Sequence, residues 1–162
     1  MINAPGEMVA RAWARLLRTH QRAMSGVQAA LKTANMPPLA WYDVMLELER
    51  AGACGLRPFE LEKATLLPQY GLSRLLERIE EAGYITREPC DEDRRGQRVL
   101  LTKAGRERRR GMWPIYAAAI GDAVGAHLTE EEAGALADLL GKLIEAPGRP
   151  LRARSGMASA AG

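Results

Sequence analysis

Residues 66–105 read LLPQYGLSRLLERIEEAGYITREPCDEDRRGQRVLLTKAG, and this stretch decides the fold. In its first half the apolar residues fall at the i, i+3, i+4 and i+7 positions of one helical face. These residues are Leu72, Leu75, Leu76 and Ile79. After Gly83 the pattern alternates as in strands, over Tyr84–Glu88 and again over Gln97–Leu101. We therefore expect a helix opened by Pro68, and then an antiparallel hairpin with its turn in Asp91–Gly96.

The sequence before this stretch predicts two further helices of the same lobe. One covers about Leu39–Arg50, with Gly52 just beyond it as a terminator. The next covers about Pro58–Thr65, because proline suits the first position of a helix. Two short helices joined by a tight link and followed by a basic hairpin make a winged helix-turn-helix. In that fold the second helix enters the major groove, and the hairpin reaches a backbone or the minor groove.

The polar face of the helix after Pro68 carries candidates for contacts with DNA. Gln69 and Ser73 are four residues apart, as are Tyr70 and Arg74, so these side chains point the same way. Arginine and glutamine have the donor geometry for guanine and adenine edges, whereas serine and tyrosine suit phosphates or bases. Arg78 lies on the same polar side. The alternative is an ordinary solvated surface helix.

The positive charge of the chain is concentrated in one segment. The whole chain has a net charge of +3, but Cys90–Arg110 alone holds eight basic and four acidic residues. All of the positive excess therefore lies there, as expected for an electrostatic footprint on nucleic acid. The alternative is a solvated, charged surface.

Long amphipathic helices are expected on both sides of the lobe. Apolar residues recur every three or four positions from about Glu7 to Ala34. A second long helix starts near Lys103, and Pro114 should kink or break it. Thr129 can cap a last helix that runs to about Glu145. Their apolar stripes have no fold of their own to cover them, which suggests a two-fold dimer; the alternative is a monomer with six helices around one core.

These expectations give a mainly α fold with a small antiparallel β-hairpin, a winged helix-turn-helix flanked by N- and C-terminal dimerisation helices. We expect residues 1–146 to form one subunit. Within it, residues 37–103 are the winged helix-turn-helix lobe, and residues 5–36 and 104–146 are the dimerisation helices. Residues 147–162 are expected to be a flexible tail.

Composition narrows the function classes. The chain has 162 residues, of which 47% are hydrophobic and 27% charged, a globular balance. Its apolar runs are too short to span a bilayer, and its N-terminus has no secretion pattern, which favours the cytoplasm. Cys54, Cys90, His20 and His127 are too few and too scattered for a disulfide framework or a ready metal site. No catalytic motif occurs, so we expect no enzyme, no cofactor and no metal.

The stretch from residue 66 to 105 resembles the MarR family of bacterial transcription regulators. The run S-R-L-L-x-R-x-E-x-x-G is matched by Ser73–Gly83, and the wing pattern D-x-R-x-x-x-V-x-L-T is matched by Asp93–Thr102. Sequence detail is specific only there, while the element order extends over about residues 7–145. Gly71 departs from the family, in which a β-branched or polar residue is commoner at this position, and glycine inside a helix costs about 1 kcal/mol relative to alanine.

The resemblance implies roles for the wing. Arg95 would enter the minor groove, with Asp93 orienting its guanidinium by a bidentate hydrogen bond. Arg94 would contact phosphate or remain a surface charge, and Arg98 is a further basic candidate. Gly96 would permit the tight turn.

The resemblance also implies a cleft for small aromatic or phenolic effectors between the dimerisation helices and the lobe. The candidate residues there are Trp13, His20, Trp41, Tyr42 and Met45, although aromatic residues at helical spacing are often simply core. Some relatives sense oxidants by cysteine, and Cys90 is the candidate, although its acidic neighbours disfavour the thiolate. Cys54 is expected to be buried.

We therefore expect a dimeric regulator that binds double-stranded DNA at a palindromic operator, a repressor released by an aromatic effector. The alternatives are a cysteine-based redox sensor and a winged-helix protein-interaction module that does not bind DNA.

Overall fold

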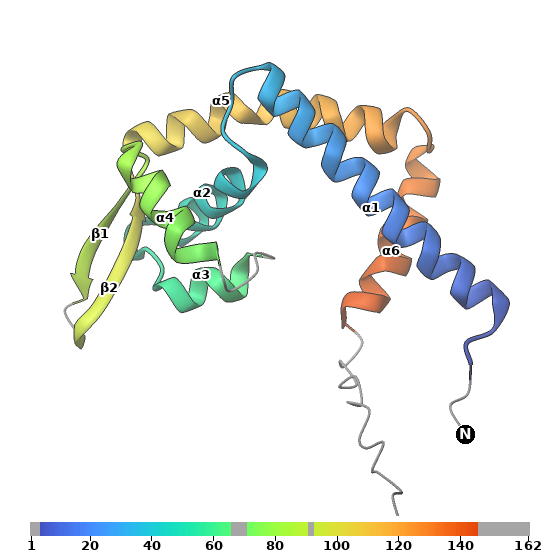
Figure 1. Ribbon diagram of the computed structural model, residues 1–162, viewed down its shortest axis with the longest axis horizontal. Coiled ribbons are helices and arrows are strands. Elements are labelled where there is room, and N and C mark those ends of the chain that lie inside the picture. Colours follow the sequence, from blue (N-terminus) through green and yellow to red (C-terminus); the bar gives the residue numbers. More distant parts are fainter. Residues whose placement is uncertain (1–3, 66–70, 91–92, 146–162) are drawn as a thin grey trace, which may run out of the picture. The chain divides into compact units, whose positions relative to one another are not determined.

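The computed structural model describes residues 4–65, 71–90 and 93–145, with backbone alone at residues 90 and 93–95. The chain divides into two compact units, the first ending at Ala126 and the second beginning at His127. The elements of the first unit are α1 (Glu7–Thr33), α2 (Leu39–Ala51), the 3₁₀ turn η1 (Gly52–Cys54), α3 (Pro58–Ala64), α4 (Leu72–Glu81), β1 (Ile85–Cys90), β2 (Asp93–Leu101), α5 (Lys103–Ile120) and the π-helical turn η3 (Gly121–Gly125). The second unit contains α6 (Glu130–Glu145). The expected mainly helical fold with one hairpin is confirmed (Figure 1).

Local sequence explains where these helices begin. Pro58 occupies the first turn of α3, and the backbone N–H of Arg57 donates to the Glu60 carboxylate at 2.7 Å. Thr102 caps α5, because its hydroxyl accepts from the Gly105 N–H at 3.0 Å. These contacts satisfy N–H groups that a helix leaves unpaired in its first turn.

The predicted cap of the last helix is confirmed. The Glu132 N–H donates to the Thr129 hydroxyl at 3.2 Å, and the Thr129 N–H donates to the Glu132 carboxylate at 2.9 Å. This reciprocal pair is a capping box.

Two features of the helices differ from the sequence-based predictions. Of the kink or break predicted at Pro114, the break is not found: α5 continues through Pro114 to Ile120, and the irregular π-helical turn lies beyond, at Gly121–Gly125. Gly71 is not inside α4 but is the capping residue before Leu72, a position where glycine is well tolerated. The expected cost of a helical glycine therefore does not apply, whereas the first residues of that predicted helix lie outside the described part of the chain.

The hairpin is longer than predicted. Strands β1 and β2 pair antiparallel from Ile85 opposite Leu101 to Pro89 opposite Gln97, after which the register shifts and Cys90 pairs with Asp93. Gly96 therefore lies within β2 rather than in the turn, between the Pro89–Gln97 and Cys90–Asp93 pairs where the register shifts. The register shift accommodates the extra residues of β2 and alters the local twist of the hairpin.

The first unit holds two hydrophobic clusters that share α2. One joins the lobe helices to the hairpin and contains Val44, Leu48, Leu61, Leu72, Leu76, Ile79, Ile85 and Val99. The other joins α1, α2 and α5 and contains Val27, Leu31, Leu39, Tyr42, Met45 and Met112. Figure 1 shows α5 running from the base of the hairpin along α2 to α1. Because α2 buries residues on both sides, it fixes the lobe against the α1 and α5 helices.

Candidate nucleic-acid interface

Helix α4 presents one apolar and one polar face, as its sequence predicts. Leu72, Leu76 and Ile79 are buried in the lobe, whereas Ser73 and Arg74 are exposed. An exposed arginine on the second helix of a helix-turn-helix has free donors for a guanine edge or a phosphate. Gln69 and Tyr70, the other two predicted contacts, lie outside the described residues.

Arg78 is exposed but also makes a contact within the lobe. Its guanidinium lies 5.9 Å from the ring centre of Trp41, and Trp41 in turn meets Tyr84 edge-on at 6.1 Å. A cation held over an indole face gains electrostatic attraction from the ring. The contact ties α4 to α2, so Arg78 contributes to the seating of the predicted recognition helix.

The wing residues singled out by the sequence lie at the start of β2. Asp93, Arg94 and Arg95 are the first three residues of that strand, next to the closed end of the hairpin. Their side chains lie outside the described part of the structure, so the expected pairing of Asp93 with Arg95 stays a prediction.

Arg98 has a partner inside the protein. Its Nη1 donates to the backbone carbonyl of Cys54 at 2.8 Å, which links β2 to η1. Cys54 itself is exposed, so the prediction that it is buried was wrong. The reason is local: η1 is a short turn at the surface, and its neighbour Leu56 supplies the apolar side chain that packs on the lobe core.

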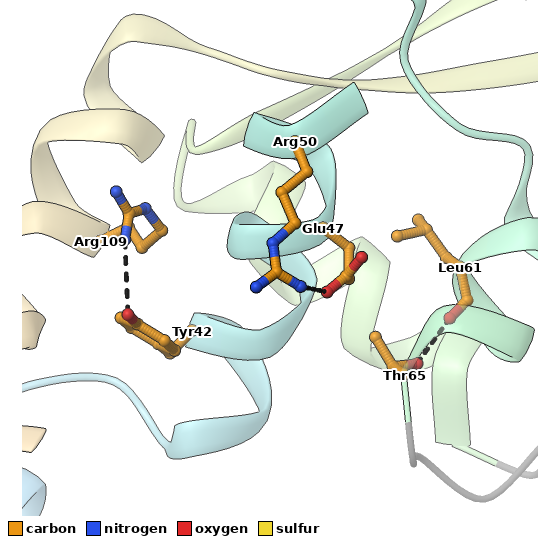
Figure 2. A network of polar contacts seen from close by, with 6 residues as sticks. All are labelled: Tyr42, Glu47, Arg50, Leu61, Thr65 and Arg109. Atoms are coloured by element: carbon orange, nitrogen blue, oxygen red, sulfur yellow. Dashed lines mark hydrogen bonds and ion pairs between the residues drawn. The ribbon is translucent and has the colours of Figure 1, made fainter. Parts of the chain in front are cut away.

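The basic side chains of the segment Cys90–Arg110 do not all lie at the surface, because some of them are partly buried. Arg108 Nε donates to the Tyr84 hydroxyl at 2.9 Å, and its guanidinium lies 5.4 Å from that ring centre. Arg109 forms an ion pair with Glu49. It also donates to the Tyr42 hydroxyl at 3.4 Å (Figure 2). Both arginines are partly buried, so they hold α5 to the lobe and do not add to a surface footprint.

Sequence reasoning missed this structural role of Arg108 and Arg109. A signal was available, because Gly105, Arg109, Met112 and Tyr116 recur at three- and four-residue spacing along α5. Gly105 and Met112 are buried, and Arg109 and Tyr116 are partly buried. The same spacing that predicts an apolar stripe therefore placed Arg109 on the inner face.

The five predicted effector residues differ in exposure among the described part of the chain. Trp13 and His20 are exposed on α1, Trp41 is partly buried, and Tyr42 and Met45 are buried in the second hydrophobic cluster. One cavity of about 330 Å³ is lined by Met36, Tyr84, Ala104, Glu107, Arg108 and Gly111. Another, of about 550 Å³, is lined by Gln28, Ala29, Leu31, Lys32, Asn35, Met36 and Pro38. Neither of these two cavities is lined by a predicted effector residue.

An aromatic cluster with an unusual carboxyl group lies where α2 meets α5. Tyr42 stacks on Trp113 at 6.4 Å between ring centres and meets Tyr116 edge-on at 5.2 Å. Burial raises the pKa of Asp43, and the nearby Glu47 adds to the rise. Burial also raises the pKa of Tyr116, with Asp43 and Tyr42 as further causes. The folded protein therefore shifts both groups toward their neutral forms relative to the unfolded chain.

The described residues form neither a metal-ligand cluster nor a helix that could span a membrane. No three His, Cys, Asp or Glu side chains of these residues gather as a metal site requires. None of the described helices combines the length and the apolar character that crossing a membrane demands.

Comparison with known proteins connects this geometry to a family. The MarR family model matches residues 34–96. Sco3205, a MarR family transcriptional regulator from Streptomyces coelicolor whose structure holds DNA, is 25% identical, with 90% of this chain and 91% of that chain covered and a TM-score of 0.80. Bordetella bronchiseptica BpsR, whose DNA binding is regulated by 6-hydroxynicotinic acid, is 25% identical over 89% and 100% of the two chains, with a TM-score of 0.76.

The fold of MarR from E. coli is also similar, with 24% identity, 81% of this chain and 95% of that chain covered, and a TM-score of 0.66. The family-model match at residues 34–96 includes α2, α3, α4 and most of the hairpin, which are the elements that form the lobe. The helix-turn-helix and the wing match the MarR family model, and over most of its length the chain is similar to winged-helix transcription regulators of that family, which are DNA-binding proteins and not enzymes.

Proposed function

We propose that the protein is a homodimeric repressor that binds a palindromic operator in double-stranded DNA and is released by a small aromatic effector. The observation that carries the DNA-binding part is the exposed pair Ser73 and Arg74 on α4, backed by the buried leucines of the same helix. A helix held this rigidly can present its polar face to a major groove without losing much conformational entropy.

The contacts with DNA fall into two groups. Arg74 and Ser73, with Gln69 and Tyr70, are proposed to read base edges and phosphates in the major groove. Arg95, oriented by Asp93, is proposed to enter the minor groove, with Arg94 on a neighbouring phosphate. The first group supplies sequence information, and the second supplies affinity that depends strongly on salt.

The homodimer is supported by apolar side chains that this chain leaves exposed. On α1 these are Met8, Val9, Trp13 and Leu17; on α6 they are Leu136, Leu139, Leu143 and Ile144. Large apolar patches of this kind mark association surfaces. A two-fold dimer would cover them and would set two α4 helices against the two halves of a palindrome.

The effector part of the proposal rests on the aromatic residues and on a relative. BpsR, at 25% identity, is regulated by 6-hydroxynicotinic acid, an aromatic acid. In this chain Trp41, Tyr42 and Met45 lie on α2, which packs against both the lobe and α5. An effector that binds better to one arrangement of these helices would shift the equilibrium only by its differential affinity, so partial release is expected at modest excess.

The proposed function is tested by selecting bound duplexes from a random pool and measuring their affinity by fluorescence anisotropy. We expect one enriched sequence with two-fold symmetry, bound at least about a thousandfold more tightly than unrelated duplex. Titration with a panel of aromatic acids, followed by tryptophan fluorescence and anisotropy, then tests release. A protein that enriches no sequence would be a protein-interaction module instead.

Redox sensing remains a second candidate because of Cys54. This thiol is exposed, whereas the side chain of the predicted sensor Cys90 lies outside the described residues. Operator binding that falls after mild peroxide treatment, but is kept in Cys54→Ser, would favour this candidate over an aromatic effector. In either case the cytoplasm is where such a regulator would meet its operator.

A further inference from the structure

The base of the wing is joined to a segment far away in the sequence. The Leu56 N–H donates to the Val99 carbonyl at 3.0 Å, and the Val99 N–H donates to the Leu56 carbonyl at 2.8 Å. Leu56 thus forms an isolated antiparallel bridge beside β2. Gly55 permits this approach, because it has a φ of +59° and a Cβ atom there would lie 2.5 Å from the Val99 carbonyl oxygen.

Arg98 adds a side-chain bond at the same junction. Val99 is buried in the lobe core, so its neighbour Arg98 points to the other face of the strand. From there its Nη1 reaches the Cys54 carbonyl at 2.8 Å, two residues before the Leu56 bridge. Glu88 lies directly across the ladder, so Arg98 has an acidic neighbour on β1 as well.

We propose that Arg98 is a positioning residue of the wing and not a DNA contact, a proposal that rests on the DNA-binding function proposed above. By joining β2 to η1 it sets the direction in which the hairpin leaves the lobe, and with it the place of residues 93–95. An isolated two-stranded hairpin is marginally stable in water. A wing held at its base before binding therefore loses less entropy when Arg95 enters a groove.

The first test uses the free protein and needs no DNA. Amide hydrogen exchange is measured at Leu56 and Val99 in the parent, in Arg98→Ala and in the control Lys103→Ala, which removes an exposed positive charge at the start of α5. We expect exchange to become about fivefold faster or more in Arg98→Ala, the effect of one hydrogen bond of ordinary net strength. The control should match the parent. Unchanged exchange in Arg98→Ala overturns the proposal.

The second test is a double-mutant cycle on the selected operator, with Arg98→Ala, Arg95→Ala and both together. If Arg98 acts through the wing tip, its loss weakens binding about fivefold in the parent but less than twofold in the Arg95→Ala protein. If Arg98 contacts DNA itself, the two losses are additive and the proposal fails. Arg98→Lys keeps the charge without the planar fork, so the proposal expects its amide exchange to lie between those of the parent and Arg98→Ala.

The two tests separate this proposal from the proposed function. A parent protein that binds no duplex overturns the function, while the exchange rates still decide whether Arg98 holds the base of the hairpin. If the parent binds the operator tightly but the affinity losses of Arg98→Ala and Arg95→Ala are additive, the proposed function stands and the positioning role of Arg98 does not.

Discussion

The winged-helix lobe and the terminal helices carry the same kind of apolar stripe, but the described residues of α6 bury none of it and those of α1 bury only part of it. In the lobe Leu48, Leu61 and Ile79 are all 0% exposed. On α6 no described residue is buried, and Leu143 and Ile144 are 65% and 84% exposed. The lobe completes its own core, whereas the N-terminal part of α1 and the apolar side chains of α6 stay exposed.

Helix α1 shows both environments along one stripe. Near its C-terminus Leu31 is 1% exposed, because it packs with α2 and α5. Near its N-terminus Trp13 is 62% exposed. Amphipathic periodicity therefore identifies which face of a helix will be covered, but not whether the same chain covers it. The predictions below test this difference.

The largest effect is expected from a cavity in the lobe core. Leu48→Ala should lower the free energy of unfolding by about 2–5 kcal/mol, because a fully buried leucine leaves a hole that the core fills only in part. Leu143→Ala on α6 is the matched control and should act only through assembly. Urea unfolding at two protein concentrations separates a loss of lobe stability, which does not depend on concentration, from a loss of assembly, which does. Equal losses for both variants at both concentrations would remove the distinction between the two regions.

The next effect concerns assembly. Replacing both Leu139 and Leu143 with glutamate should raise the dimer dissociation constant at least about 100-fold, since each buried leucine contributes about 1.5–3 kcal/mol. Lys142→Glu, a change of charge at an exposed position of the same helix, should change it little. Light scattering over a dilution series measures both. Removal of the chain from Thr129 onward should also abolish dimerisation and tight DNA binding, and a truncated protein that stays dimeric would contradict the proposal.

A substitution on the lobe surface should affect DNA and leave assembly unchanged. Arg74→Ala should weaken binding to the selected operator by about 1–3 kcal/mol if it makes a bidentate guanine contact, and should weaken binding to mutated operators less. The dimer dissociation constant should equal that of the parent. Equal losses on all duplexes would assign Arg74 to a phosphate instead.

The wing should behave differently from α4. Arg95→Ala should weaken binding to good and mutated operators by similar factors, and should make the salt dependence shallower by up to about one unit of log slope. Asp93→Ala should reproduce this only in part, because it frees the arginine without removing its charge. Anisotropy at several salt concentrations measures the slopes. If Arg95→Ala binds like the parent at every salt concentration, the wing tip is a solvated turn that does not contact DNA.

The smallest effect is expected where α2 meets α5, at Asp43. Its pKa in the folded protein is raised above the ordinary 3.8 by burial and by Glu47, so the folded state binds the proton more tightly than the unfolded state. Stability should therefore fall as the pH rises from about 3.8 through the raised pKa. Asp43→Asn should gain stability over the parent at pH 7 and lose that advantage at pH 3.5. Melting temperatures across this range test the sign, and an opposite trend would mean that the Asp43 carboxylate stabilises the fold.

Much of the fold could be predicted because helix ends and strand alternation depend on residues a few positions apart. Pro58 and the Thr129–Glu132 pair start their helices as expected. The register of the hairpin could not be predicted, since Gly96 is as acceptable in a turn as in a strand where the register shifts. Of the kink or break predicted at Pro114, the break does not occur, because α5 continues past it to Ile120 despite the missing N–H.

For the candidate site, the sequence by itself determined the composition of α4 and of the wing. The exposed Ser73 and Arg74, with leucines behind them, follow from helical periodicity alone. Only the tertiary structure decided which arginines of the basic segment face inward. Arg98 bonds to a carbonyl 44 residues away, and Arg109 bonds to a hydroxyl 67 residues away. A long, flexible guanidinium takes whichever partner the fold brings within reach, and sequence spacing does not encode that distance.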